Sequence, residues 1–493
     1  MTDRQKVIKD CVRYSAVTVI GQGVGLIRAI FIPVLLTPLQ FGIWNLMNVI
    51  VSYGSNAHLG VLDGMNKLIP MLRGQGQESE AEVIKDSAFW VNVFLSAGWG
   101  LVIWIASYAV PPLYTVALRI TALVVFLLGL FSYYFSLLRA DNRFTLVSAG
   151  VGGLSILSAV LILTLGYFSA DRLSGVLIGL TISYVLILFF WFFKGQYRFG
   201  LRLNGLAVRR SFSTGAPLLI TGVLSVLFLS VDRWVIASKL GAAMVGYYAI
   251  GILVSNLIGL IPGSIASVLY PKMLERFGAT GRSTTLMSLL DGPVRVVVML
   301  LSLLIGGCIL ILPQLIKFFL PKYLPSVPFL GILVSAAFFF GAASVPGNFI
   351  IAVNKQKPLI AIQVAAILLA VTMDFVAVQM GWGLIGVAWS TAGAYLVYGG
   401  GYMFLAAYFA FERRAEMTRF LVDVYALFAA MVLGLVLTMT LVPDGETAKA
   451  ALAFTTLRFL LFISILLPAL WWCNRDGKVM SVIRNELVAC PKP

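Results

Sequence analysis

The sequence predicts an all-α polytopic membrane protein with about 14 transmembrane helices, because a spanning helix needs about 20 mostly apolar residues and many such runs are present. The chain has 493 residues, of which 60% are hydrophobic and only 11% are charged. Its mean hydropathy is +0.97. So few charged residues could not cover the surface of a water-soluble protein of this size. We therefore expect the lipid bilayer to be its solvent.

The apolar runs, separated by short polar breaks, define the expected spans. The first run follows a charged segment and continues into a second full-length run, so we expect no cleavable signal peptide. The four cysteines show neither a metal-binding spacing nor a disulfide framework. The spans are predicted over residues 14–37, 43–66, 88–110, 113–136, 145–168, 174–194, 213–238, 245–270, 292–316, 326–353, 359–381, 384–410, 420–442 and 450–473.

The net charge of +16 is unevenly distributed along the chain. Most of the 36 Lys and Arg residues fall in the N-terminal segment, in the connections after even-numbered spans and in the C-terminal tail. Cytoplasmic loops are enriched in Lys and Arg, so we expect both termini to be cytoplasmic. The charge thus indicates membrane topology, and no nucleic-acid partner is expected.

The most basic connection, residues 194–210, separates two halves of six spans each. Both halves enter the membrane in the same orientation, which predicts a parallel repeat. Gly42 follows Arg28 at nearly the same distance as Gly246 follows Arg233. We expect an N-terminal lobe over residues 1–204, a C-terminal lobe over residues 205–412, and two additional helices with a cytoplasmic tail over residues 413–493.

Polar side chains recur at helical spacing in spans one, two, seven and eight, at matching places in the two halves. Charged groups in an apolar span are costly and usually face a bundle interior or a watery cavity. We therefore expect a hydrophilic cavity between the halves. The candidate substrate-binding residues are Arg28, Arg233, Asn45, Asn48, Ser52, Ser55 and Asn256.

A second group of residues is a candidate for ion or proton coupling. Asp232 and Arg233 are sequence neighbours that could instead neutralise each other. Asp63 could pair with Lys67, and a histidine in a span is more often a hydrogen-bonded packing group than a proton relay. A lone buried acid in span eleven could bind an ion or be neutral and hydrogen-bonded. The group consists of Asp63, Asp232, Asp374 and His58.

The sequence contains no recognisable catalytic motif. It has no P-loop, and a single histidine with dispersed cysteines disfavours a zinc site. The outward connections are short, whereas an enzyme acting on polymer outside the membrane usually needs a folded external loop or domain. We expect a protein that is not an enzyme and has no cofactor, with Na⁺ or H⁺ coupling as an open alternative.

Three pairs of stretches carry a family resemblance. They are Asp232-Arg233-Trp234-Val235-Ile236 with Gly246-Tyr247-Tyr248, Phe41-Gly42-Ile43-Trp44 with His58-Leu59-Gly60-Val61, and Asn354-Lys355-Gln356-Lys357 with Gly386-Val387-Ala388. Together they resemble the polysaccharide-biosynthesis (Wzx-type) flippases of the multidrug/oligosaccharidyl-lipid/polysaccharide (MOP) exporter superfamily. The resemblance covers nearly the whole chain.

The resemblance implies two six-helix lobes that move an undecaprenyl-pyrophosphate-linked oligosaccharide across the bacterial plasma (inner) membrane by alternating access. Arginine is a permanently charged, planar donor suited to phosphate, so Arg28 and Arg233 would contact the diphosphate or acidic sugars. The repeat unit would serve the synthesis of O-antigen, capsule or exopolysaccharide. Membrane lipids and polysaccharide polymerase or export machinery would be the other partners.

Two alternative functions are compatible with the sequence. A multidrug or organic-cation antiporter of the same superfamily would favour an acidic or aromatic cavity, and twelve spans are usual for that branch. A non-transporting membrane scaffold of a polysaccharide-assembly complex would have no need of aligned polar stripes. Both fit the sequence less well than a flippase does.

Overall fold

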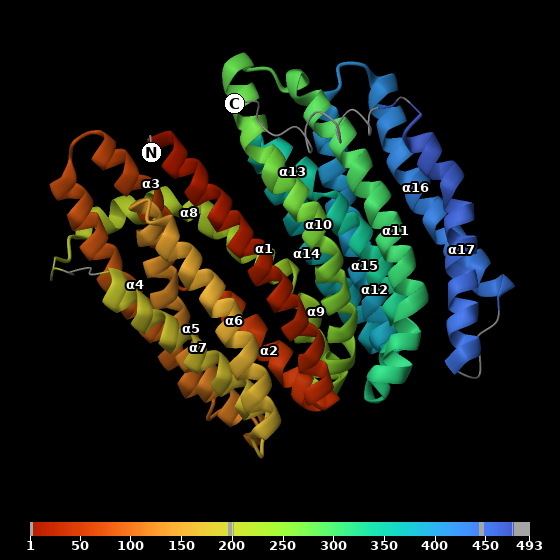
Figure 1. The fold of residues 1–493 in the computed structure, drawn as a ribbon, viewed down its shortest axis with the longest axis horizontal. Helices are drawn as coiled ribbons and strands as arrows, with labels where there is room; N and C mark the ends of the chain where they lie inside the picture. The colour runs from red at the N-terminus through yellow and green to blue at the C-terminus, as the bar shows by residue number, and fades with distance from the viewer. Residues whose placement is uncertain (1–2, 196–199, 201, 443–447, 476, 478–493) are drawn as a thin grey trace. The chain divides into compact units, whose positions relative to one another are not determined.

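The structure is a computed structural model that describes residues 3–195, 200, 202–442, 448–475 and 477. Within these residues it contains seventeen α-helices, two short 3-10 helices and no strand (Figure 1). Eleven helical segments of this part of the chain are long and apolar enough to cross a membrane. The predicted all-α, multi-pass membrane class is confirmed, while the number of fourteen spans stays a prediction.

The chain divides into two compact units. Unit 1 comprises Met1–Arg233 and Gly241–Gly246, and unit 2 comprises Trp234–Leu240 and Tyr247–Pro493. Residues 211–233, which follow the basic connection 194–210, thus belong to the same unit as the helices before that connection. The predicted lobe boundaries and the parallel repeat stay predictions.

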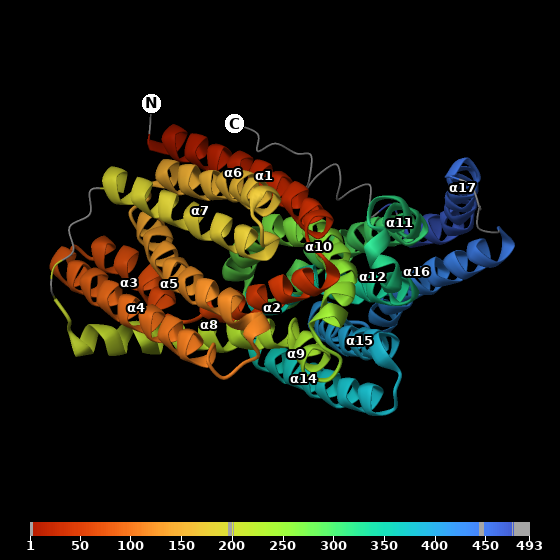
Figure 2. The ribbon, with the colours of Figure 1, turned by 90° about the horizontal axis from the view of Figure 1, so that it is seen from below.

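Unit 1 is a bundle of long helices in which neighbours pack pairwise. Helix α6 packs against α1 and α7, α4 packs against α5, and α3 packs against α4 and α8 (Figures 1 and 2). The helices are α1 (Asp3–Leu35), α2 (Pro38–Gly54), α3 (Val61–Gly74), α4 (Glu78–Ala106), α5 (Pro112–Ala140), α6 (Phe144–Phe168), α7 (Arg172–Gly195) and α8 (Gly205–Phe228).

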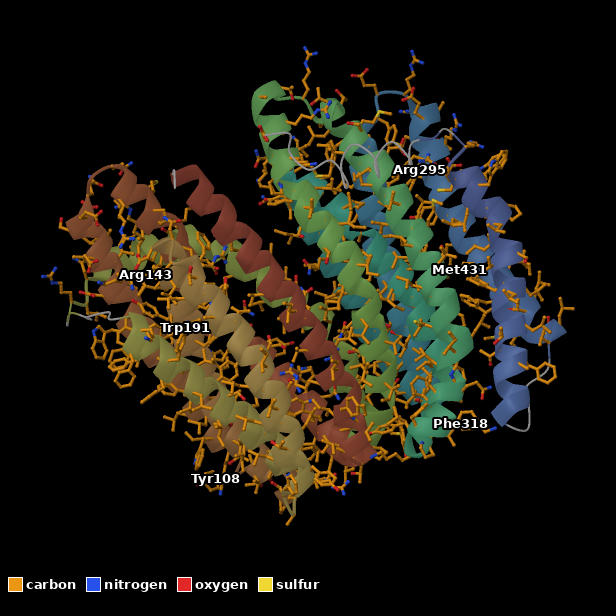
Figure 3. The ribbon with its side chains drawn as sticks, in the orientation of Figure 1. Tyr108, Arg143, Trp191, Arg295, Phe318 and Met431 are labelled. Atoms are coloured by element: carbon orange, nitrogen blue, oxygen red, sulfur yellow. The ribbon has the colours of Figure 1, made fainter. Side chains whose placement is uncertain are left out.

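Trp191 of α7 lies in the core of unit 1. Its side chain is fully buried, and its ring stacks on Phe131 of α5 with 4.8 Å between the ring centroids. The indole Nε1 donates a hydrogen bond of 3.0 Å to the carbonyl of Leu146 on α6. A Cβ on Gly150 would overlap the indole ring, so the absence of a side chain at Gly150 leaves space for the indole. One aromatic side chain thus connects three helices (Figure 3).

The predicted second span, residues 43–66, is wrong as a single helix. The chain leaves α2 at Gly54 and enters α3 at Val61, and in the turn Leu59 and Gly60 have φ values of +48° and +81°. Positive φ is readily adopted by glycine and interrupts a right-handed helix. The apolar run therefore contains two shorter helices.

The predicted seventh span, residues 213–238, is also divided. Helix α8 ends at Phe228 and a short helix, α9 (Val231–Lys239), follows. At this break the hydroxyl of Ser230 lies 3.0 Å from the Tyr53 hydroxyl of α2. A hydrogen bond between these side chains links the break to α2.

Unit 2 is centred on α11, which packs against α12, α16 and α17, while α15 packs against α12 and α14. The predicted tenth span, residues 326–353, contains two successive helices. Helix α10 (Ala242–Thr280) begins in unit 1, and from Tyr247 onward it belongs to unit 2. The other helices are α11 (Met287–Phe319), α12 (Val327–Ala342), α13 (Ser344–Ala352), α14 (Gln356–Gln379), α15 (Gly383–Ala410), α16 (Arg414–Leu441) and α17 (Ala448–Cys473), with 3-10 helices η1 (Ser283–Leu286) and η2 (Pro321–Ser326). The predicted cytoplasmic tail lies almost wholly outside the described residues.

The two glycines that mark the predicted repeat meet each other in unit 1. A Cβ on Gly42 of α2 would lie 1.7 Å from the carbonyl oxygen of Ala242, and a Cβ on Gly246 would lie 1.9 Å from the carbonyl oxygen of Pro38. Each glycine thus faces the carbonyl four residues before the other glycine. Only glycine permits two helix backbones to approach this closely.

A second reciprocal glycine contact joins α3 to α8. A Cβ on Gly64 would lie 2.0 Å from the carbonyl oxygen of Ser211, and a Cβ on Gly215 would lie 1.9 Å from the carbonyl oxygen of Gly60. The spacing of four residues is the same as in the first contact. This close approach places α8 directly against α3 within unit 1.

Candidate functional site

Arg28 projects from α1 into the contact with α6 and α7. Its Nη1 donates a hydrogen bond of 2.7 Å to the hydroxyl of Ser158 on α6, and Tyr184 of α7 lies close enough to interact electrostatically. The Nε atom is buried without a hydrogen-bond partner. No carboxylate of a described residue lies within 4.0 Å of the guanidinium. A permanently charged group therefore lies half-buried without an ion pair to any acid that the structure describes.

Small residues bring α6 to this arginine. A Cβ on Gly21 would lie 2.9 Å from the hydroxyl oxygen of Ser155, and a Cβ on Gly152 would lie 2.5 Å from Val17. These contacts advance in the same direction along both helices, so α1 and α6 run parallel. Small residues at a helix interface permit such close packing in a membrane.

Arg233 lies in the first turn of α9 and is also half-buried. Its backbone N–H donates to Oδ1 of Asp232 at 2.7 Å, while its side-chain Nε is buried without a partner. Its guanidinium forms no ion pair with a carboxylate among the residues that the structure describes. The alternative in which Asp232 neutralises Arg233 through a direct ion pair is therefore not realised.

The polar residues of α2 donate hydrogen bonds to their own helix. Asn45 and Asn48 donate through Nδ2 to carbonyls four residues earlier, at 2.8 Å. The hydroxyls of Ser52 and Ser55 donate to Asn48 and Ser52 carbonyls, at 2.8 and 2.7 Å. Both serines are exposed, and the asparagines are half-buried. The Ser55 hydroxyl also accepts a hydrogen bond of 3.5 Å from Nδ2 of Asn56. The side-chain oxygens of Asn45, Asn48 and Ser52 accept no hydrogen bond from the described part of the chain, so they could accept hydrogen bonds from a ligand.

Asn256 belongs to an exposed polar face of α10. Gly263, Ser264 and Ser267 follow it on the exposed side of the same helix, and a Cβ on Gly263 would meet no atom within 4 Å. Both serines donate to carbonyls of their own helix, at 2.8 Å. This exposed polar face lies within a candidate membrane span, and the contact of Asn256 with a ligand stays a prediction.

Two of the candidate coupling residues, His58 and Asp63, lie near each other. His58 Nδ1 accepts a hydrogen bond of 3.0 Å from the N–H of Gly60, and Asp63 lies near enough to interact electrostatically with His58. The alternative pair between Asp63 and Lys67 is not formed, because no ion pair within 4.0 Å joins them. Asp232 is 5% exposed and Asp374 is fully buried. No group of three potential metal-ligating side chains exists among the described residues.

Unit 2 contains an ionic cluster that was not predicted from the sequence. Arg295 of α11 donates at 2.7 Å to Asp291 on its own helix and at 2.7 Å to Asp423 on α16. It also donates at 3.0 Å to the carbonyl of Cys473 at the end of α17. Trp472 donates to the second oxygen of Asp423 at 3.0 Å. The cluster therefore joins α16 and α17 to α11; Arg295 is labelled in Figure 3.

This cluster is fully removed from solvent, since Arg295, Asp291 and Asp423 are each 2% exposed. The spacing of four residues between Asp291 and Arg295 is the one signal in the sequence that could have indicated it. Asp423, 128 residues after Arg295 in the chain, could not be paired with it from sequence alone. The additional helices are thus anchored by charge as well as by apolar packing.

Comparison with known proteins supplies independent evidence of the family. Residues 34–276 match the family model described as polysaccharide biosynthesis protein. The family resemblance predicted from the sequence is thereby confirmed. No curated protein matches the chain.

Solved structures show the same fold. A lipid II flippase, MurJ, in an inward-closed conformation matches with a TM-score of 0.67 and 15% identity, covering 94% of this chain and 99% of that one. An inward-facing multidrug resistance MATE family transporter of the MOP superfamily matches with a TM-score of 0.64 and 15% identity, covering 81% and 98%. A MOP superfamily transporter from Pyrococcus furiosus matches with a TM-score of 0.58 and 15% identity, covering 84% and 96%. The chain therefore has the MurJ/MATE-like fold.

Proposed function

We propose that the protein is a flippase for an undecaprenyl-pyrophosphate-linked oligosaccharide, the repeat unit of a surface polysaccharide. It acts by alternating access in the bacterial plasma membrane, with both termini cytoplasmic. The match to polysaccharide biosynthesis proteins supports the pathway, and the MurJ/MATE-like fold supports transport. No covalent step is required, because the protein only lowers the cost of moving a polar headgroup through hydrocarbon.

The environment of Arg28 is the observation that carries the proposal. A charge inside a membrane bundle is costly unless it is paired or solvated. Arg28 has a hydroxyl partner on Ser158 but no acidic partner among the described residues. A diphosphate would supply the missing negative charge, and a guanidinium matches its oxygens with several parallel donors. We assign Arg28 to the diphosphate and Arg233 to the diphosphate or an acidic sugar.

The polar residues of α2 fit the sugar part of such a substrate. Oligosaccharides present many hydroxyl groups, which donate to amide and hydroxyl oxygens. Asn45, Asn48, Ser52 and Ser55 already use a donor on their own helix, so they would act mainly as acceptors. Asn256, on the exposed face of α10, would add a further contact. The polyprenyl tail would remain in the lipid.

The alternatives fit these residues less well. An organic cation would be repelled by guanidinium groups that form no ion pair with a carboxylate of the described residues, which disfavours the antiporter. A scaffold would gain nothing from two half-buried arginines that form no ion pair with an acid in the described ranges. Coupling to Na⁺ or H⁺ through Asp63, Asp232, Asp374 or His58 remains a prediction.

A flipping assay tests the proposal. The purified protein is reconstituted in liposomes that contain a fluorescent undecaprenyl-pyrophosphate-linked oligosaccharide, and the label accessible from outside is followed with time. Hydrogen bonds to charged groups contribute about 1.5–3 kcal/mol, so Arg28→Ala should slow flipping at limiting substrate by about 10- to 100-fold. Arg28→Lys keeps the charge but not the planar donor set, so we expect an intermediate rate.

Arg172→Ala is the matched control. Arg172 is exposed at the start of α7 and donates to the carbonyl of Leu35 at 2.9 Å, so its loss should leave the rate near that of the wild type. Wild-type flipping by folded Arg28→Ala protein would remove Arg28 from the site. Absence of flipping in the wild type, together with efflux of organic cations, would favour the antiporter.

A further inference from the structure

An open apolar groove runs along α4, α5 and α7 within unit 1. Its volume is about 750 Å³, within the range of about 300–1,000 Å³ that is typical of sites for small ligands. Three small residues line part of the groove, namely Ala97 and Gly100 of α4 and Ala122 of α5. Bulkier apolar side chains form most of the rest of the lining, to which Thr181 of α7 also contributes: Leu101, Trp104, Ile120, Leu123, Phe126 and Ile178.

Arg119 provides a positive charge in this apolar lining. Its guanidinium carbon lies 4.8 Å from the centre of the Tyr108 ring and 5.4 Å from that of Trp104. Its Nε donates to the hydroxyl of Ser107 at 3.3 Å. The two terminal nitrogens have no protein partner among the described residues, so four of the five N–H donors of the guanidinium remain available.

The aromatic residues indicate the depth of this arginine in the bilayer. Tyr108, labelled in Figure 3, is 71% exposed and lies between α4 and α5. Trp104, in the last turn of α4, is 42% exposed. Tyrosine and tryptophan concentrate at the level of the lipid headgroups. The groove extends from Arg119 along residues that belong to candidate membrane spans. Its charged end thus lies where headgroups lie, and its apolar part lies where acyl chains lie.

We propose that this groove binds one anionic phospholipid of the bilayer, with its phosphate on Arg119 and one acyl chain along α4 and α5. The charge of Arg119 complements an anionic headgroup. A free phosphate would leave the apolar groove unfilled. A zwitterionic phospholipid also has a phosphate, but its cationic headgroup would be repelled by the guanidinium and would weaken the binding. The proposal does not depend on the transported substrate, because neither Arg28 nor the polar residues of α2 line the groove.

Native mass spectrometry of the purified full-length protein tests this site. The protein is titrated with phosphatidylglycerol and, separately, with phosphatidylcholine that carries the same acyl chains. We expect the wild type to retain one phosphatidylglycerol in preference to phosphatidylcholine. Arg119→Gln should reduce that preference about tenfold, as expected from the loss of one charged hydrogen-bonding partner.

Two further variants separate the roles of charge and shape. Ala97→Leu adds a larger side chain from an exposed position of α4 that lines the groove, so it should weaken the binding of both lipids while Arg119 remains. Arg172→Gln removes an exposed arginine that does not line the groove, and it should retain the wild-type preference.

Equal retention of the two lipids by the wild type would overturn the proposal, and so would an unchanged preference in Arg119→Gln. Undecaprenyl phosphate is added as a competitor to distinguish the transported lipid from a bilayer phospholipid. Displacement of phosphatidylglycerol by an equal concentration of undecaprenyl phosphate would assign the groove to the transported lipid and also overturn the proposal.

Discussion

Replacing Gly246 by alanine tests the close contact between α2 and the start of α10. The added Cβ would lie 1.9 Å from the carbonyl oxygen of Pro38, whereas real Cβ contacts are essentially never shorter than 3.0 Å. The backbones must therefore separate by at least 1.1 Å, the difference between these distances. No rotamer change relieves the overlap, because both groups belong to the main chain or are fixed to it.

The cost follows from the packing lost along the contact. A gap of about 0.5–1 Å already forfeits a quarter to a half of the attraction between facing atoms. Overpacked substitutions typically cost about 1–3 kcal/mol, and alanine in place of a helical glycine returns about 0.5–1 kcal/mol. We therefore expect a net loss of about 1–2 kcal/mol for Gly246→Ala, measured as a lower unfolding temperature of the purified protein in detergent micelles.

Gly259→Ala is the matched control in the same helix. A Cβ at Gly259 would meet no atom within 4 Å, so this variant should be as stable as the wild type or slightly more stable. Gly42→Ala should behave like Gly246→Ala, because its Cβ would lie 1.7 Å from the carbonyl oxygen of Ala242. Unfolding of Gly246→Ala at the same temperature as Gly259→Ala would refute the close contact.

Two other predictions concern buried polar groups. Asp423→Ala removes a partner of Arg295, and breaking a buried ion pair from one side costs about 3–5 kcal/mol, so the unfolding temperature should fall steeply. Glu416→Ala, at an exposed ion pair, should change stability by at most about 1 kcal/mol and serves as the control; equal effects would contradict the burial of the cluster. Trp191→Phe keeps most of the ring but removes the hydrogen bond to Leu146, so it should cost about 1–2 kcal/mol in the same assay, and an unchanged unfolding temperature would contradict this hydrogen bond.

Much of the fold could be predicted because apolar runs in a bilayer must be helical. Backbone groups have no other hydrogen-bond partners in hydrocarbon, so each long run corresponds to a helix or to two successive helices. Gly54 and Gly60 could have indicated the helix break before Val61. The break was missed because the spans were predicted from hydropathy, which does not depend on backbone conformation. The break near Ser230 has no glycine or proline to mark it. Contact of that residue with Tyr53 is tertiary and lies beyond local sequence patterns.

The candidate site was predictable in its residue types but not in its contacts. Arg28 and Arg233 were identified because a charged residue in a membrane span is energetically costly. In the structure neither arginine forms an ion pair with an acidic residue among the described residues. Periodicity identified the polar side of α2, but not that its side chains donate to their own helix. The partnership of Arg295 with Asp423 depends on how α11 and α16 pack, which no local pattern specifies.

The most direct test of the central proposal is a binding cycle that changes both Arg28 and the phosphate groups of the lipid. The dissociation constant is measured for wild-type and Arg28→Gln protein, each with undecaprenyl-pyrophosphate-linked oligosaccharide and with an analogue whose diphosphate is replaced by an uncharged linker. A direct contact predicts that removal of the diphosphate weakens binding to the wild type by about tenfold or more, but has a much smaller effect on Arg28→Gln. Equal losses in the two proteins would contradict contact between Arg28 and the diphosphate.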